Sequence, residues 1–224
     1  GLEAAWELKK AGIDVQVLEA APILMGRQLD ENASDILRMF AEKSGVKIST
    51  GVSVEAVEGD GHVSGVRLSD GQVIPAEVVV VSAGVRANTA LAKEIGLDAD
   101  RAVKVNERME TSVPNVYACG DCAEFNGANY AVWPEASEQG RIAGANAAGD
   151  QIEYAATAPT LTFHGMNTAL FAAGDNGKNP NLLYKTAEFK DMGKGRYSKY
   201  YFLNNRLAGV IMIGDLSDMV KITE

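Results

Sequence analysis

Residues 111–124, TSVPNVYACGDCAE, constrain the fold of this chain most, because an apolar run leads directly into a Gly-Asp pair. The run at 116–118 predicts a buried strand that stops abruptly at Gly120 and Asp121. A glycine at this corner lets the backbone approach a ligand closely, because no Cβ stands in the way. The carboxylate of Asp121 can only accept hydrogen bonds, so it suits a sugar hydroxyl and repels a phosphate. Since ligands of open α/β sheets bind beyond the carboxyl ends of strands, we expect Asp121 to face a ligand.

The start of the chain predicts half of a dinucleotide-binding unit, a helix followed by a strand. Residues 1–11 are rich in good helix formers and are followed by a glycine, a typical C-terminal cap. Residues 13–18 alternate too little for a half-exposed strand, so we expect a strand buried on both faces. Glu19 ends this strand, where its two oxygens can bind the 2′-hydroxyl of an adenosine ribose and would repel a 2′-phosphate. No Arg or Lys follows before Arg27, so the pattern favours NADH over NADPH.

Residues 30–82 predict a second helix and then three short strands. Asp30 is a suitable N-terminal cap for the helix, and Gly45 is a suitable stop. The buried side of the helix would carry four apolar residues: Ile36, Leu37, Met39 and Phe40. The strands are expected at 46–58, 62–69 and 72–82, separated by Gly-Asp-Gly and Asp-Gly turns that are strong hairpin signals.

The remaining segments change character at about residue 150. A short alternating strand is expected within 98–110, and Pro134 suits the first turn of a helix that runs from Trp133 to about Ala148. Beyond Gly149 the sequence carries short β-like runs and turns, including an antiparallel hairpin around Asn204 and Asn205.

Composition excludes several classes of protein. With 224 residues, 46% of them apolar, the chain can form one or two domains with real cores. Its net charge of −9 argues against nucleic acids and anionic membranes as partners. No apolar run approaches the roughly 20 residues of a membrane span, and no signal peptide is visible. Two cysteines do not make a disulfide scaffold, so a reducing cytoplasm is the expected location.

Thr111, the apolar run 116–118 and the pair Gly120-Asp121 together resemble the second flavin motif of the pyridine nucleotide-disulfide oxidoreductase family. The resemblance implies that Asp121 binds the ribityl chain of FAD. It also implies that the helix beginning at Trp133 points at the pyrimidine edge of the flavin. The positive end of the helix dipole would there stabilise the negative charge of the reduced flavin.

The NAD-binding features of the same family are matched in the same order. Gly1 would be the last glycine of a G-x-G-x-x-G motif, and Glu3 stands where family members place a glutamate near the nicotinamide. A favourable charge in a first helical turn explains Glu3 equally well. Gly84 lies in a segment resembling the one in which a glycine lets the backbone pass under NAD. The family usually has Pro before the following Asn, whereas Ala87 stands here.

The resemblance covers the whole chain and implies an α/β fold in three parts. Residues 1–97 would form an incomplete Rossmann-like NAD-binding domain, three-layered, with a β-meander and without its first strand. Residues 98–152 would be the C-terminal part of an FAD-binding domain. Residues 153–224 would form a small α+β C-terminal domain of the interface type, as in rubredoxin reductases and related NADH oxidases. We therefore interpret the chain as a fragment and expect it alone to hold neither FAD nor NAD tightly.

The implied function is an FAD-dependent NADH oxidoreductase that passes electrons to a small protein or chemical acceptor. An alternative is a non-catalytic nucleotide-binding or interaction module of the same fold. A third hypothesis is a disulfide reductase using Cys119 and Cys122, which form C-x-x-C. We assign neither cysteine a redox or metal-binding role, because the pair brackets the flavin corner and no second C-x-x-C or nearby His completes a zinc site. No residue is assigned a catalytic role, since the cofactors carry the chemistry.

The acceptor is not specified by the sequence. Rubredoxin, oxygen, nitrite through a partner, and peroxide all remain open. Residues 176–206 carry seven Lys or Arg against two Asp or Glu, a local net charge of +5. Such a run is usually a solvated face, but it can also dock an acidic electron carrier such as rubredoxin. A homodimer is a further expectation from the family.

Overall fold

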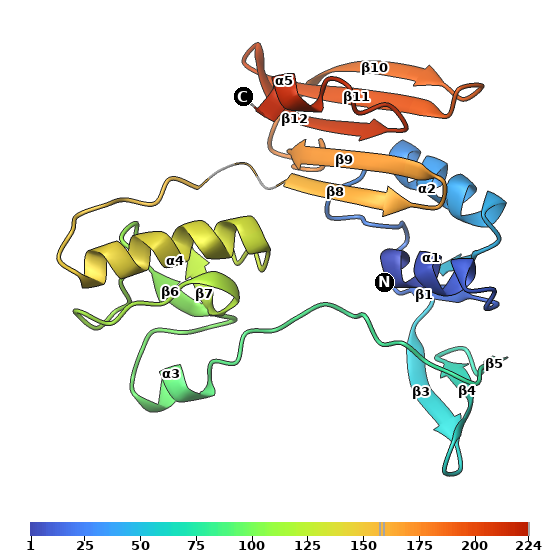
Figure 1. Ribbon diagram of the computed structural model, residues 1–224, viewed down its shortest axis with the longest axis horizontal. Coiled ribbons are helices and arrows are strands. Elements are labelled where there is room, and N and C mark those ends of the chain that lie inside the picture. The colour runs from blue at the N-terminus through green and yellow to red at the C-terminus, as the bar shows by residue number, and fades with distance from the viewer. Residues whose placement is uncertain (157, 159, 224) are drawn as a thin grey trace. The chain divides into compact units, whose positions relative to one another are not determined.

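The computed structural model describes residues 1–156, 158 and 160–223. The chain divides into two compact units, Gly1–Ser82 with Ala158–Glu224, and Ala83–Thr157. We call them the first and the second unit. Both combine helices with strands (Figure 1), so the expected mixed α/β class is confirmed. The three-part division at 97 and 152 stays a prediction. Among the described residues, no helix is long and apolar enough to cross a membrane.

The first unit begins with two helix and strand pairs. They are α1 (Leu2–Lys10), β1 (Gln16–Glu19), α2 (Glu31–Lys43) and β2 (Lys47–Thr50), and the two strands pair in parallel. The predicted cap of α2 is confirmed, because the Asp30 side chain accepts a hydrogen bond from the Ala33 amide at 2.9 Å. Such a cap satisfies one of the orphan amide groups of the first helical turn.

A meander of three antiparallel strands follows. These are β3 (Val54–Gly59), β4 (Val63–Leu68) and β5 (Val73–Pro75), and both predicted hairpin turns are confirmed. The single strand expected at 46–58 is wrong, since β2 and β3 belong to different sheets. The backbone leaves the strand conformation between them at Gly51, whose φ of +70° costs a glycine little.

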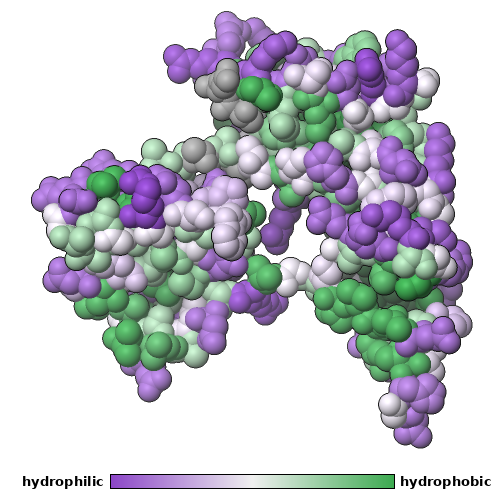
Figure 2. All heavy atoms as spheres, in the orientation of Figure 1, coloured by the Kyte–Doolittle hydropathy of each residue, from purple (hydrophilic) through white to green (hydrophobic). Residues whose placement is uncertain are grey.

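Two apolar segments of the first unit are less buried than expected. No strand forms at 78–81, where Val78 is 76% and Val81 79% exposed. Figure 2 shows apolar side chains at the surface of this unit near the meander. The strand expected to be buried on both faces is also only half-buried, and Ile13 lies 48% exposed. An apolar run becomes a strand only beside a hydrogen-bonding partner, and in the described chain β1 pairs with β2 alone.

The C-terminal part of the first unit is a five-stranded antiparallel sheet, called the C-terminal sheet below. In chain order it contains β8 (Thr160–Gly165), β9 (Thr168–Gly174), β10 (Lys185–Asp191), β11 (Arg196–Leu203) and β12 (Arg206–Ile213). Their spatial order is β10-β11-β12-β9-β8, and the short helix α5 (Met219–Thr223) follows. The hairpin predicted around Asn204 and Asn205 is confirmed, and both residues have positive φ as a tight hairpin turn requires.

One hydrophobic core joins α1 and α2 to the C-terminal sheet. Its fully buried members include Leu37 from α2, Leu29 from the segment before α2, and Leu170, Ile211 and Ile213 from the sheet. Burial of each such side chain stabilises the fold by about 1.5–3 kcal/mol. The core therefore holds the two sequence-distant parts of the first unit together.

The second unit is smaller. It contains α3 (Ala90–Glu94), β6 (Val103–Val105), a 3₁₀ turn (Gly120–Cys122), β7 (Ala123–Phe125) and α4 (Trp133–Ala147). The short strand expected within 98–110 is confirmed as β6, and so is the Pro134 start of α4. The strand expected at 116–118 is wrong: the strand parallel to β6 lies after the Gly-Asp corner, at β7. Residues 116–118 make isolated bonds instead of a ladder, including Ala118 N to Met109 O at 3.1 Å and Val116 N to Val113 O at 3.2 Å.

Candidate functional site

Glu19 lies at the carboxyl end of β1, beside Thr50 at the end of the parallel strand β2. One of its carboxylate oxygens, Oε1, accepts a hydrogen bond from the Ala21 amide at 2.8 Å. The side chain is therefore held in place by the backbone that follows the strand. Within the described part of the chain the other oxygen, Oε2, accepts no hydrogen bond, so it can receive a ribose hydroxyl. This is the edge of a parallel sheet at which ligands bind.

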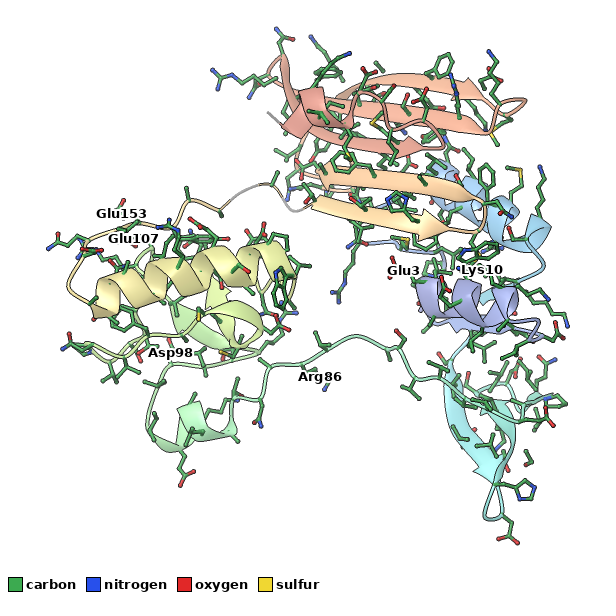
Figure 3. The ribbon with its side chains drawn as sticks, in the orientation of Figure 1. Glu3, Lys10, Arg86, Asp98, Glu107 and Glu153 are labelled. Atoms are coloured by element: carbon green, nitrogen blue, oxygen red, sulfur yellow. The ribbon has the colours of Figure 1, made fainter. Side chains whose placement is uncertain are left out.

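Gly1 and Glu3 lie at the start of α1. Gly1 is the N-cap residue, and Glu3 is exposed in the first turn, at the end of the helix opposite Lys10 (Figure 3). The first amides of α1 have no side-chain cap, and the helix dipole makes this end favourable for an anion. A Cβ added to Gly1 would make only ordinary contact with Ser82, at 3.7 Å. The described neighbours of Gly1 therefore do not themselves demand a glycine there.

The Gly120–Asp121 corner is built against α4. Gly120 has a φ of +71°, a conformation that costs glycine little, and its amide donates to Oε1 of Gln139 at 2.8 Å. A Cβ at this position would lie 3.3 Å from Cβ of Ala136 on α4. Both the backbone conformation and the close approach of the helix therefore favour a glycine at position 120.

Asp121 is fixed through its backbone while its side chain stays exposed. Its carbonyl oxygen accepts from Nδ2 of Asn129 at 2.9 Å, and the same amide group donates to the Ala123 carbonyl at 2.7 Å. Sequence reasoning missed Asn129 and the buried Gln139, the two side chains that shape this corner. Neither belongs to the motif around Gly120, and their amide side chains carry no pattern that singles them out.

Gly84 and Trp133 are both exposed. Gly84 has a φ of +88° in a segment without regular structure, and a Cβ added to it would meet no atom within 4 Å. Nothing described around Gly84 therefore excludes the close passage of a ligand. Trp133 is the first residue of α4, and 84% of it is exposed. Of the seven candidate residues, Gly1, Glu3 and Glu19 belong to the first unit and Gly84, Gly120, Asp121 and Trp133 to the second.

The two cysteines flank the corner as free thiols. Cys119 is half-buried, and Cys122 is exposed with its Sγ 3.3 Å from the Cys119 carbonyl oxygen. Burial, together with the neighbouring Cys122, raises the pKa of the Cys119 thiol. A raised pKa lowers the fraction of reactive thiolate. In the described part of the chain, no group of three or more His, Cys, Asp or Glu side chains is arranged to hold a metal ion.

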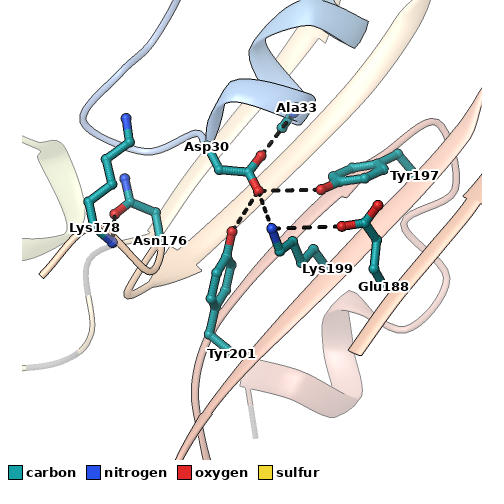
Figure 4. Close-up of polar contacts among 8 residues, drawn as sticks. All are labelled: Asp30, Ala33, Asn176, Lys178, Glu188, Tyr197, Lys199 and Tyr201. Atoms are coloured by element: carbon teal, nitrogen blue, oxygen red, sulfur yellow. Dashed lines mark hydrogen bonds and ion pairs between the residues drawn. The ribbon is translucent and has the colours of Figure 1, made fainter. Parts of the chain in front are cut away.

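Asp30 has a second role that its position as a helix cap did not indicate. Its Oδ2 accepts from Nζ of Lys199 at 2.7 Å and from the Tyr201 hydroxyl at 2.8 Å, with the Tyr197 hydroxyl at 3.4 Å (Figure 4). Burial alone would raise the pKa of Asp30, but the hydrogen bonds from Lys199, Ala33 and Tyr201 hold it below its ordinary value. Burial and the Asp30 charge raise the pKa values of both tyrosines. This Asp30 cluster ties the start of α2 to β11.

Two family descriptions match the chain. Pyridine nucleotide-disulphide oxidoreductase matches residues 1–140, and the rubredoxin NAD+ reductase C-terminal domain matches residues 159–224. The chain is 34% identical to nitrite reductase (NAD(P)H) of Bacillus subtilis strain 168, over 97% of this chain and 27% of that protein. It is 27% identical to NADH-rubredoxin oxidoreductase of Clostridium acetobutylicum, over 97% of this chain and 53% of that protein.

Solved structures show the same likeness. An FAD-dependent pyridine nucleotide-disulphide oxidoreductase from Desulfovibrio vulgaris superposes with a TM-score of 0.86 and 27% identity, covering 98% of this chain and 58% of that one. The covalent putidaredoxin reductase-putidaredoxin complex gives a TM-score of 0.84 at 26% identity, covering 99% of this chain and 54% of that one. The chain thus spans between about a quarter and three fifths of the length of these four proteins.

Proposed function

Because this chain belongs to the pyridine nucleotide-disulphide oxidoreductase family, we propose that it forms part of a flavoprotein that oxidises NADH through FAD. Electrons then pass onward to a small protein or chemical acceptor. Residues 1–97 serve the pyridine nucleotide, 98–152 the flavin and 153–224 form the small C-terminal domain. The observation that carries the proposal is the Gly120–Asp121 corner, where a glycine with positive φ lies close to α4 and the next residue has an exposed carboxylate and a hydrogen-bonded backbone.

The residues around this corner fit a flavin. Gly120 removes the Cβ that would separate the backbone from a ligand, and Asp121 offers its carboxylate to the hydroxyls of a ribityl chain. The start of α4 at Trp133 would offer helix amides and the positive end of the dipole to the pyrimidine edge of a bound flavin. When bound, FAD supplies the chemistry, because it accepts hydride from NADH and releases the electrons to an acceptor. The residues of this chain would bind the two cofactors and orient them toward each other.

Glu19 fits the adenosine ribose of NADH. Its free oxygen can accept from the 2′-hydroxyl, while Ala21 holds the other oxygen. A 2′-phosphate would meet a carboxylate and be repelled. Gly1 and the first turn of α1 would supply amides for the pyrophosphate, and Glu3 in the same turn would contact the nicotinamide side. The complete flavoprotein therefore prefers NADH to NADPH.

The test is to reduce the bound flavin of the complete flavoprotein anaerobically and to measure the reduction from the loss of flavin absorbance. NADH should reduce it with a kcat/KM about ten- to hundred-fold above that for NADPH, since a hydrogen bond to a charged group contributes about 1.5–3 kcal/mol. Glu19→Arg should narrow or reverse this ratio, whereas Glu42→Arg, at an exposed position of α2, should leave it unchanged. Equal use of both nucleotides by the unmodified protein would refute the role of Glu19. A protein that binds nucleotide without flavin reduction would be a non-catalytic module instead.

For the acceptor, we propose a small acidic electron-carrier protein. The basic segment 176–206 supports this, because six of its seven cationic residues are exposed: Lys178, Lys185, Lys190, Lys194, Arg196 and Arg206. The names of two similar proteins include a protein partner, rubredoxin in one and putidaredoxin in the other. Docking through opposite charges predicts that the rate with such a carrier falls steeply between about 50 and 300 mM salt. Reduction of ferricyanide, which needs no docked protein, serves as the comparison. A rate with the carrier that is independent of salt would contradict charge-driven docking.

A further inference from the structure

The segment between Glu19 and α2 has no regular structure, yet buried side chains and backbone hydrogen bonds fix its conformation. We call it the connecting loop (residues 20–30). Leu24 and Leu29 are buried in the core of the first unit, and the Leu24 amide donates to Oγ of the buried Ser34 at 2.8 Å. The Gln28 and Leu29 amides both donate to the Met25 carbonyl at 2.9 Å. The loop thus has one defined shape directly beside the proposed ribose carboxylate.

The outer side of the connecting loop is held by the C-terminal sheet. From the turn between β9 and β10, Nδ2 of Asn176 donates to the Arg27 carbonyl at 3.1 Å, and Nζ of Lys178 donates to the Gly26 carbonyl at 2.7 Å. Figure 4 shows both side chains extending from this turn toward the segment that precedes α2. Two side chains from a distant part of the sequence therefore fix two consecutive carbonyl groups of the loop.

The turn that carries these two side chains is itself tied to the Asp30 cluster. Gly177 has a φ of +76°, and a Cβ there would lie 2.5 Å from Cε1 of Tyr201. Only a glycine lets the turn lie against this ring, whose hydroxyl donates to Asp30. The C-terminal sheet and the turn before β10 therefore hold the connecting loop at two places. One is its middle, at Gly26 and Arg27, and the other is its last residue, Asp30.

We propose that Asn176 and Lys178 are positioning residues for the adenosine half of NADH. They hold the backbone at Gly26 and Arg27, so that the connecting loop, whose Ala21 amide binds Glu19, keeps this carboxylate in place for the ribose. This inference rests on the proposed function, and it gives the C-terminal sheet a part in binding the adenosine half of the nucleotide. It predicts an effect confined to the adenosine end, because both side chains bind the backbone of the loop that follows Glu19.

The experiment uses the complete flavoprotein with Asn176→Ala and Lys178→Met combined, and Lys43→Met on the exposed end of α2 as matched control. KM for NADH should rise about five-fold and kcat stay within two-fold, since the lost hydrogen bonds are exposed and water partly replaces them. The Kd for ADP-ribose, measured by calorimetry, should rise by the same factor. Turnover of reduced nicotinamide mononucleotide, which lacks the adenosine half, should not change. Lys178→Arg keeps a hydrogen-bond donor at position 178. As a single substitution in the otherwise unmodified flavoprotein, it should therefore keep most of the ADP-ribose affinity that the double variant loses.

The outcomes separate the two proposals. If the unmodified protein neither binds ADP-ribose nor is reduced by NADH, the proposed function is wrong and this inference falls with it. If the unmodified protein does both and the double variant binds ADP-ribose as tightly, the positioning role alone is overturned. An equal loss with NADH and with reduced nicotinamide mononucleotide also overturns it, because the effect is then not confined to the adenosine end.

Discussion

Lys199→Met should destabilise the first unit strongly, because it removes the only cation that contacts Oδ2 of Asp30 among the described residues. The side chains of Lys199 and Asp30 are 18% and 13% exposed, so the pair is largely shielded from water. Methionine keeps most of the aliphatic stem, but the change also removes the contacts of Nζ with Oε2 of Glu188 at 3.7 Å and with the Tyr201 ring at 5.3 Å. The part of the cost that belongs to the pair with Asp30 is therefore taken from the comparison with an Asp30→Asn background.

The expected loss in the free energy of unfolding depends on which hydrogen bonds Asp30 keeps in the variant. Removal of one partner from a fully buried ion pair costs about 3–5 kcal/mol, because an uncompensated charge stays behind. Asp30 keeps the Ala33 amide at Oδ1 and the Tyr201 hydroxyl at Oδ2, which still stabilise its charge. Hydrogen bonds to a charged group contribute about 1.5–3 kcal/mol each. We therefore expect the free energy of unfolding to fall by about 2 kcal/mol.

Urea unfolding followed by tryptophan fluorescence measures this loss. The chain has two tryptophans: Trp6 packs against the core of the first unit, and Trp133 lies exposed in the second. In a Trp133→Phe background, the signal reports the first unit alone. With a slope of about 2 kcal/mol per molar urea, the midpoint should fall by about 1 M.

The matched control is Lys185→Met, at an exposed position of β10 whose Nζ contacts only Asn205 among the described residues. It should cost less than about 0.5 kcal/mol. In an Asp30→Asn background, Lys199→Met should lose most of its effect, because the two changes remove the same interaction. The reasoning is refuted if Lys199→Met costs no more than the control, or as much in the Asp30→Asn background as in the unmodified chain.

Three further predictions concern pH, the thiols and the flavin corner. Because the pKa of Asp30 is lowered, its contribution to stability is complete above its ordinary pKa of 3.8 and is lost as pH falls through the lower folded value. The raised pKa values of Tyr197 and Tyr201 contribute stability that is complete below pH 10 and is lost as the pH rises above it. Trp6 fluorescence, followed through the acid range and through the alkaline range, should show a loss of stability in each. A fluorescence that does not change with pH would contradict the stabilising role of the Asp30 cluster. Cys119→Ala with Cys122→Ser should leave flavin reduction by NADH within about ten-fold of the unmodified rate, and a larger fall with flavin still bound would restore the dithiol hypothesis. Gly120→Ala should lower the flavin content of the complete flavoprotein more than Gly127→Ala, since both positions have positive φ but only the first meets α4, and equal losses would count against the contact.

Sequence reasoning succeeded where the cause of a structure is local. Asp30 caps α2 because the side chain reaches an amide three residues on, and the Asn204-Asn205 turn forms because both residues accept positive φ. It failed where a strand needs a distant neighbour. The apolar runs at 78–81 and 116–118 have the composition of strands, but neither contains its own hydrogen-bonding partner.

The candidate site divides in the same way. Glu19, Gly120 and Asp121 were predicted from their residue types and from the order of motifs around them, and their roles toward nucleotide and flavin stay predictions. The side chains that hold this backbone in place, such as Gln139, Asn176 and Lys178, could not be found. Their hydrogen bonds go to backbone groups, which every residue has. No pattern of side chains therefore records such a contact in the sequence.

Asp30 shows why a complete local explanation can conceal a second role. One oxygen satisfies the cap of α2, and this alone accounts for an aspartate at that position. The other oxygen faces the C-terminal sheet, where Lys199 and Tyr201 meet it. Substitution of Asp30 itself would remove both interactions at once and could not distinguish them. Lys199 takes no part in the cap, so substitution there separates the connection between the two parts of the first unit from the stability of the helix.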